Sequence, residues 1–126
     1  MRSVARLFLG GEAAGFAAAA LMHAGILARG YEHSKAPTAE SVIGGVLLAA
    51  LITTFVTPAS SRAVALAAQA FALLGTVVGL FTIAIGVGPR TIVDLAIHAG
   101  FVTALVTGLV CVARSVDVTH AGVTRG

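Results

Sequence analysis

Two histidines in strongly apolar stretches are the residues of this chain best suited to chemistry. "LMHAGIL" contains His23 and "LAIHAGFV" contains His98, and each imidazole is followed by Ala-Gly. Imidazole exchanges protons near neutral pH and is the commonest metal ligand in proteins. Asp94 precedes His98 by one helical turn, where its carboxylate could accept a hydrogen bond from the ring and fix its tautomer. The three side chains predict a polar pocket.

The rest of the chain has the composition of a membrane protein. Of its 126 residues, 58% are hydrophobic and only 10% are charged, whereas soluble domains carry about 25% charged residues. Long apolar runs predict helices at about residues 7–28, 41–57, 63–87 and 92–113. We therefore expect an all-α fold, an integral membrane up-down-up-down four-helix bundle over residues 1–114. Residues 115–126 are expected to form a short mobile cytoplasmic tail.

The breaks between the apolar runs are short and contain proline. They read "RGYEHSKAPTAE", "TPASSR" and "GVGPRT", so consecutive helices should be antiparallel neighbours. Thr91 followed by Asp94 has the pattern of a capping box, with Asp in place of the usual Glu, and predicts the start of the last helix. Capping is also a purely structural explanation for Asp94.

The positive charges predict an orientation in the membrane. One side of the expected bundle carries five of them and the other side three: Arg2, Arg6, Arg62, Arg114 and Arg125 against Arg29, Lys35 and Arg90. This asymmetry predicts that both termini lie in the cytoplasm. A cleaved signal peptide at "MRSVARLFLGG" is an alternative, but Glu12 interrupts its apolar region.

The two histidines are expected to meet. Measured from the outer ends of the predicted helices, His23 lies about 7 to 8 Å deep and His98 about 9 Å deep. The first and fourth helices are neighbours when the bundle closes, so the rings can converge. Glu40 is expected at the outer start of the second helix, and Arg29 and Arg90 should flank the same outer mouth.

A second polar position is expected in the other half of the membrane. Glu12 and His23 are eleven residues apart, which puts them on one helix face about 16 Å apart. Gln69, near the inner start of the third helix, could hydrogen-bond Glu12. Glycine pairs four residues apart, Gly11 with Gly15 and Gly75 with Gly79, predict close helix contacts, within one chain or between two.

These features leave three functional interpretations open. The first is an interaction or accessory subunit, or a homo-oligomer, whose partners are the lipid bilayer and itself or another membrane protein. The second is a haem (haem b) or metal protein in which His23 and His98 are ligands, Asp94 orients His98, and Arg29 or Arg90 pairs with propionates. The third is a small proton-coupled transporter that uses Glu12.

One structural alternative stays open, and other functional classes are not expected. The polar residues in the helices can also be structural groups that hydrogen-bond neighbouring helices. An enzyme is not expected, because no serine or cysteine nucleophile has a positioned base and "GVGPR" lacks the Lys-Ser/Thr of a phosphate-binding loop. No basic run with interleaved aromatic residues indicates a nucleic-acid partner.

The chain resembles two groups of small membrane proteins. Its length, four helices and first-helix Glu12 are similar to the small multidrug resistance transporters, but it has no Trp and only Tyr31 to grip a cationic drug. "EAAGFAAAALMHAGILARGYEH", "AESVIGGVLLAAL" and "AQAFALLGTVVGLFTIAIGVGPRTIVDLAIH" resemble an uncharacterised family of small four-helix bacterial integral membrane proteins. The "GVGPRT" loop before the last helix is the most distinctive part. This resemblance implies a bacterial inner-membrane setting and no particular activity.

Overall fold

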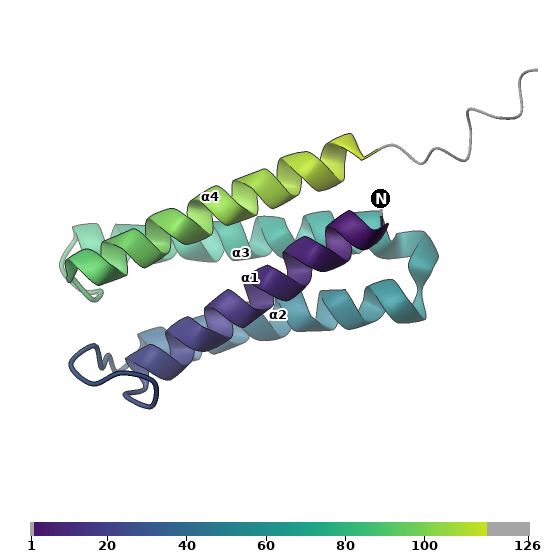
Figure 1. Cartoon of the computed structure of the whole chain (residues 1–126). Coiled ribbons are helices and arrows are strands. Elements are labelled where there is room, and N and C mark those ends of the chain that lie inside the picture. Colours follow the sequence, from purple (N-terminus) through teal and green to yellow (C-terminus); the bar gives the residue numbers. More distant parts are fainter. Residues whose placement is uncertain (1, 116–126) are drawn as a thin grey trace, which may run out of the picture.

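The computed structural model describes residues 2–115 and is all-helical over that range. Its helices are, in order, α1 (Arg2–His23), α2 (Ala36–Val56), α3 (Ser61–Ala84) and α4 (Ile92–Arg114), and one 3-10 turn, η1 (Pro58–Ser60), precedes α3. The helices run alternately up and down (Figure 1), so the loops 24–35 and 85–91 lie at one end of the bundle. We call this the histidine end. The expected cytoplasmic tail, from residue 116 on, lies outside the described residues.

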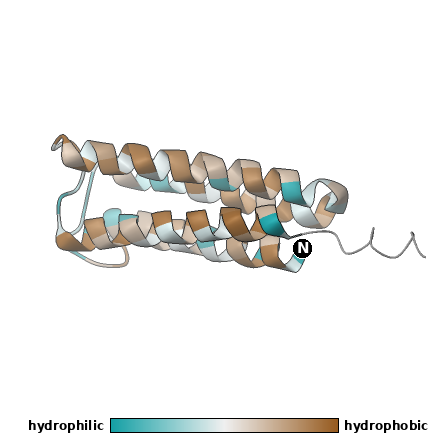
Figure 2. Ribbon diagram, turned by 90° about the horizontal axis from the view of Figure 1, so that it is seen from above, coloured by the Kyte–Doolittle hydropathy of each residue, from teal (hydrophilic) through white to brown (hydrophobic). Residues whose placement is uncertain are grey.

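The helices have the length and composition of membrane spans. Four stretches of 22, 21, 27 and 23 residues are long and apolar enough to cross a bilayer. Large apolar side chains face outward along the whole length of the bundle, and Ile92 on α4 is 86% exposed. Figure 2 shows hydrophobic segments, in brown, along all the helices. The expectation of four long apolar helices is confirmed.

The first helix ends five residues earlier than its apolar run predicts, at His23 instead of residue 28. Gly25 adopts a left-handed conformation with a φ of 73°. The amide of Ile26 bonds the carbonyl of Leu21 at 2.9 Å, and the amide of Gly25 bonds that of Met22 at 3.0 Å, which together form a Schellman motif. His23 is therefore the last residue of α1. The expected depth of about 7 to 8 Å from the end of that helix is wrong.

Other helix boundaries also differ from the prediction. α3 stops at Ala84 instead of residue 87, because Gly86 forms a second Schellman motif with a φ of 86°. α2 starts at Ala36, five residues before the predicted position, since Pro37 sits in its first turn, where a proline needs no amide partner. α1 already begins at Arg2, whereas the start of α4 agrees with the prediction.

The glycines make contacts within the chain. A Cβ on Gly15 would lie 3.1 Å from the ring of Phe101, and one on Gly44 would lie 3.3 Å from the Cβ of Phe16. Both glycines of the second predicted pair, Gly75 and Gly79, are likewise packed against another helix. Gly11, the partner of Gly15 in the first predicted pair, has nothing within 4 Å of its Cβ position. Glycine at these positions thus leaves room for the side chains of the neighbouring helix to approach the backbone closely.

Substituting the glycine that ends α1 should destabilise the fold. In Gly25→Ala the new Cβ would be forced into the left-handed region and would lie 2.9 Å from Cγ of Glu32. We expect a loss of about 1 to 2 kcal/mol in the free energy of unfolding, measured by chemical denaturation in mild detergent. The control Gly11→Ala, a helical position with open space, should be neutral or slightly stabilising. Equal losses in the two variants would contradict this account.

Candidate functional site

The histidine end contains a buried cluster of His23, Glu40 and Asp94, which we call the imidazole triad. Nδ1 of His23 lies 2.8 Å from both carboxylate oxygens of Glu40 on α2. Nε2 of the same ring lies 2.9 Å from Oδ1 of Asp94 on α4. Only 1% of His23, 6% of Glu40 and 1% of Asp94 is exposed. One imidazole therefore joins two carboxylates from two other helices.

Asp94 is held in place by the start of its own helix. Its second oxygen, Oδ2, accepts the amide of Thr91 at 2.9 Å and the hydroxyl of Thr91 at 2.6 Å. The amide of Asp94 donates in return to Oγ1 of Thr91 at 3.1 Å, so the predicted capping box is confirmed. Capping and binding to His23 are thus compatible, because each uses a different carboxylate oxygen.

His98 lies beside the triad without belonging to it. Its Nδ1 is 2.8 Å from the backbone carbonyl of Asp94, one turn back on α4. The Asp94 carboxylate was expected to bond His98, but in the structure it bonds His23, which approaches from α1. Since Nδ1 must donate to the carbonyl, Nε2 of His98 carries a lone pair while the ring is neutral. That nitrogen points at α3, where a Cβ on Gly79 would lie only 2.9 Å from it.

The geometry of the triad fixes a minimum number of protons. Each contact of His23 with a carboxylate requires one proton between nitrogen and oxygen, so the three groups hold at least two. With two protons, an imidazolium and two carboxylates, or their tautomer, carry a net charge of −1. A third proton would make the cluster neutral. No Lys or Arg among residues 2–115 forms an ion pair with either carboxylate.

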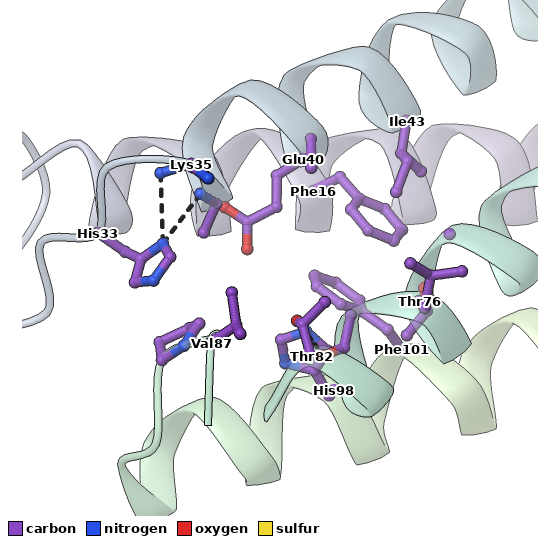
Figure 3. A pocket seen from close by; sticks show the side chains of 17 residues that line it. Phe16, His33, Lys35, Glu40, Ile43, Thr76, Thr82, Val87, His98 and Phe101 are labelled. Carbon is purple, nitrogen blue, oxygen red and sulfur yellow. Dashed lines mark hydrogen bonds between the residues drawn. The ribbon is translucent and has the colours of Figure 1, made fainter. Parts of the chain in front are cut away.

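A cavity adjoins the triad between α2, α3 and α4, and Glu40 is common to both (Figure 3). Its volume is about 200 Å³, and most of its wall is apolar. Phe16 and Phe101 lie in this wall and stack on each other with ring centroids 4.1 Å apart. His98 contributes one of the few polar groups. The arrangement joins an apolar chamber to a buried ionisable cluster.

Residues of the first loop complete the cavity, although no motif in the sequence pointed to them. His33 and Lys35 line its side at the histidine end. Nδ1 of His33 accepts the amides of Lys35 and Ala36 at 3.3 and 3.1 Å, which ties the loop to the start of α2. The amide of His33 donates to the carbonyl of His23 at 3.0 Å and folds the loop back over the end of α1.

The two arginines expected at the mouth lie in different surroundings. Arg90 donates from Nε to the carbonyl of Ile83 at 3.1 Å and from a terminal nitrogen to that of Ala84 at 3.3 Å. It therefore satisfies the last carbonyls of α3. Arg29 is exposed in the first loop. Both arginines lie in loops at the histidine end, and neither lines the cavity.

A second polar pair lies in the other half of the bundle, as expected. Nε2 of Gln69 on α3 donates to the two oxygens of Glu12 on α1, at 2.9 and 3.1 Å. Glu12 is 5% exposed and Gln69 is fully buried. Gly108 on α4 covers the pair, and a Cβ there would overlap the amide of Gln69. Oε1 of Gln69 has no hydrogen-bond partner among the described residues.

The residues do not fit a haem or metal ion held by both histidines. Such a group needs a lone pair from each ring, and both nitrogens of His23 already face carboxylates. Within residues 2–115 no three His, Cys, Asp or Glu side chains are arranged to hold a metal ion. Of these two histidines, only His98 has a ring nitrogen that faces no carboxylate or carbonyl.

Comparisons with known proteins add no function. No protein-family model, no curated protein and no solved structure matches this chain. The resemblance to small bacterial membrane proteins therefore stays a prediction, and the chemistry of the site must be argued from its own geometry.

The triad predicts energetic coupling between its members. Removing His23 leaves two carboxylates without their shared donor, so the effects of His23→Gln and Glu40→Gln should not add. A double-mutant cycle on the free energy of unfolding should give a coupling of about 1 to 3 kcal/mol. As a control, His23→Gln combined with Glu12→Gln should be additive to within about 0.5 kcal/mol, because these sites are well separated. Additivity in both cycles would contradict the proposed coupling.

The Glu12–Gln69 pair predicts a strict need for glycine at position 108. Gly108→Ala should push the Gln69 amide away from Glu12 and cost about 1 to 3 kcal/mol of unfolding free energy, measured by denaturation in detergent. Gly100→Ala is the matched control on the same helix, with nothing within 4 Å of the Cβ position, and should cost nothing. If the two variants have the same free energy of unfolding, close packing of Gly108 against this pair does not contribute to stability.

Proposed function

We propose that this protein is a small proton-coupled carrier embedded in a membrane. In this proposal the imidazole triad binds and releases the proton, and the adjoining cavity holds the transported solute. The bundle lies in a bacterial inner membrane with its histidine end outward and both ends of the chain in the cytoplasm, following the charge asymmetry of the sequence.

One observation carries the proposal: Glu40 belongs to both the triad and the cavity. Ionisable groups inside membrane proteins are costly and mark proton or substrate pathways. The triad carries a charge of −1 with two protons and no charge with three. A buried negative charge is stabilised by a proton or by another cation. Because Glu40 lines the cavity, a cation bound there can take the place of the proton.

Further polar groups continue from the cavity toward Glu12. Thr76 lines the cavity from α3 and is 2% exposed. Gln69 lies two turns from Thr76 on the same face of α3, about 10 Å along the helix axis, and bonds Glu12. After a half-turn of the amide, the unpartnered Oε1 of Gln69 would accept a hydrogen bond from the protonated carboxyl group of Glu12. Each half of the bundle therefore contains a buried carboxyl group that can be protonated.

Self-association, or service as an accessory subunit, is the second candidate. A groove between α1 and α2 is lined mainly by glycine and alanine, including Gly10, Ala14, Ala17 and Gly45. Such a surface would allow close approach of a helix from another chain. Native mass measurement in mild detergent tests this candidate, because a monomer that co-purifies with no partner would count against it.

The proton site can be tested without knowing the solute. In protein reconstituted in lipid, infrared difference spectra between alkaline and acidic pH should show the carbonyl band of a newly protonated buried carboxyl group. We expect this proton on Glu40, since Oδ2 of Asp94 already accepts two hydrogen bonds. The Glu12→Gln variant should keep the band, and Glu12→Gln with Glu40→Gln should lose it. Identical spectra of these two variants would overturn the proposal.

A further inference from the structure

We infer that the cavity binds a small aromatic monoamine in its protonated, cationic form. This inference rests on the proposed function, because the ammonium group would replace the third proton of the imidazole triad. It names the solute that the carrier would exchange for a proton, and its support comes from the size, wall and charge of the cavity.

The size of the cavity fits one aromatic ring with a short tail. Its volume is about 200 Å³, and an apolar protein cavity of roughly 150 Å³ binds benzene. Two glycines of α3 help keep this space open. Gly75 faces Ile43 of α2, and Gly79 faces His98 of α4, so a side chain at either position would enter the cavity wall.

The wall suits an aromatic cation. The stacked rings of Phe16 and Phe101 offer an apolar and electron-rich surface to a ligand ring or ammonium group. Figure 3 shows these rings on the side of the cavity away from His33, with Glu40 between them. A ligand lying along this axis would place its ring beside the phenylalanines and its polar end near Glu40.

Glu40, His98 and Thr76 present acceptors to the cavity, whereas the donors, Lys35 and Nε2 of His33, lie at the histidine end. Glu40 offers carboxylate oxygens, and His98 offers the lone pair of Nε2, since its Nδ1 donates to the Asp94 carbonyl. The hydroxyl of Thr76 donates to the carbonyl of Ala72 and so presents lone pairs. An ammonium group has three donors and no acceptor, and it complements this set. A carboxylate would face lone pairs at each of these positions.

The charges around Glu40 also favour a cation. The titratable groups that surround it are His23 from α1, His98 and Asp94 from α4, and His33 and Lys35 from the first loop. Described α3 residues of the wall contribute no titratable group. Among the described residues of the wall, Lys35 is the one fixed positive charge, and it is exposed to solvent. Binding is charge-balanced: the neutral three-proton triad plus an ammonium ion gives the two-proton triad with bound ammonium and one released proton.

Calorimetry with three ligands of similar size tests the inference. We would titrate purified protein in uncharged nanodiscs with 2-phenylethylamine, 2-phenylethanol and 3-phenylpropionate. The amine should bind at least about tenfold more tightly than the alcohol, as expected for a charge-assisted hydrogen bond. At acidic pH, the dependence of its binding enthalpy on the buffer should reveal release of about one proton per bound amine.

Variants separate the cavity from the rest of the surface. Glu40→Gln should abolish both the amine preference and the proton release, whereas Glu32→Gln, the same change on an exposed glutamate of the first loop, should alter neither. Ala39→Phe fills the cavity from an exposed position of α2 and should weaken binding of both the amine and the alcohol.

Three results would overturn the inference: equal binding of amine and alcohol, tighter binding of 3-phenylpropionate, or no binding of any of the three. The infrared band of Glu40 distinguishes the failures. If the band is present but the amine does not bind, the proton site stands and the solute assignment is wrong. If the band is absent as well, the proposed function fails with it.

Discussion

The sharing of one buried imidazole by two carboxylates is the constraint on which the histidine end of this molecule depends. His23 can satisfy Glu40 and Asp94 together only if α1, α2 and α4 meet at one point. In an interior without water, each of these groups would be costly to bury alone. The triad therefore links three helices more specifically than apolar contacts could, and it leaves a charge that changes with a single proton.

Helix ends, rather than helix middles, build this site. The Schellman motif at Gly25 makes His23 the last residue of α1, so the first loop can fold back over it. The capping box fixes Asp94 in the first turn of α4, and Pro37 allows α2 to begin early enough to bring Glu40 inside the bundle. Each of these helix-end features is local, and together they place three ionisable side chains close to polar atoms of the loops. A helix end also accounts for Arg90, which donates hydrogen bonds to the last carbonyl groups of α3.

Residue size, as well as polarity, distinguishes the outward-facing surface of the bundle from its interior. Glycine and alanine allow the helices to approach closely, while large apolar residues face outward. Close packing leaves little room inside, so the cavity beside Glu40 exists where Gly75 and Gly79 replace larger residues. A cavity of this kind beside a cluster of variable charge is what a carrier of small cations requires. The groove on α1 and α2 is a separate surface with no charged cluster of its own apart from the edge of Glu40.

The sequence by itself determined the four apolar helices and the capping box at Thr91, because the length of an apolar run and the signals at a helix start are local properties. It made the pairing of Glu12 with Gln69 an expectation, and the packing of α3 against α1 decided it. It could not determine the partner of Asp94. The same His-Ala-Gly tripeptide ends α1 at Gly25 and continues α4 through Gly100, and only the packing of the following segment decides between these outcomes. Once α1 stops at His23, its ring reaches both carboxylates, and His98 is left with a backbone carbonyl. The triad and its cavity are therefore properties of the tertiary structure, since they depend on which side chains three helices bring to one point.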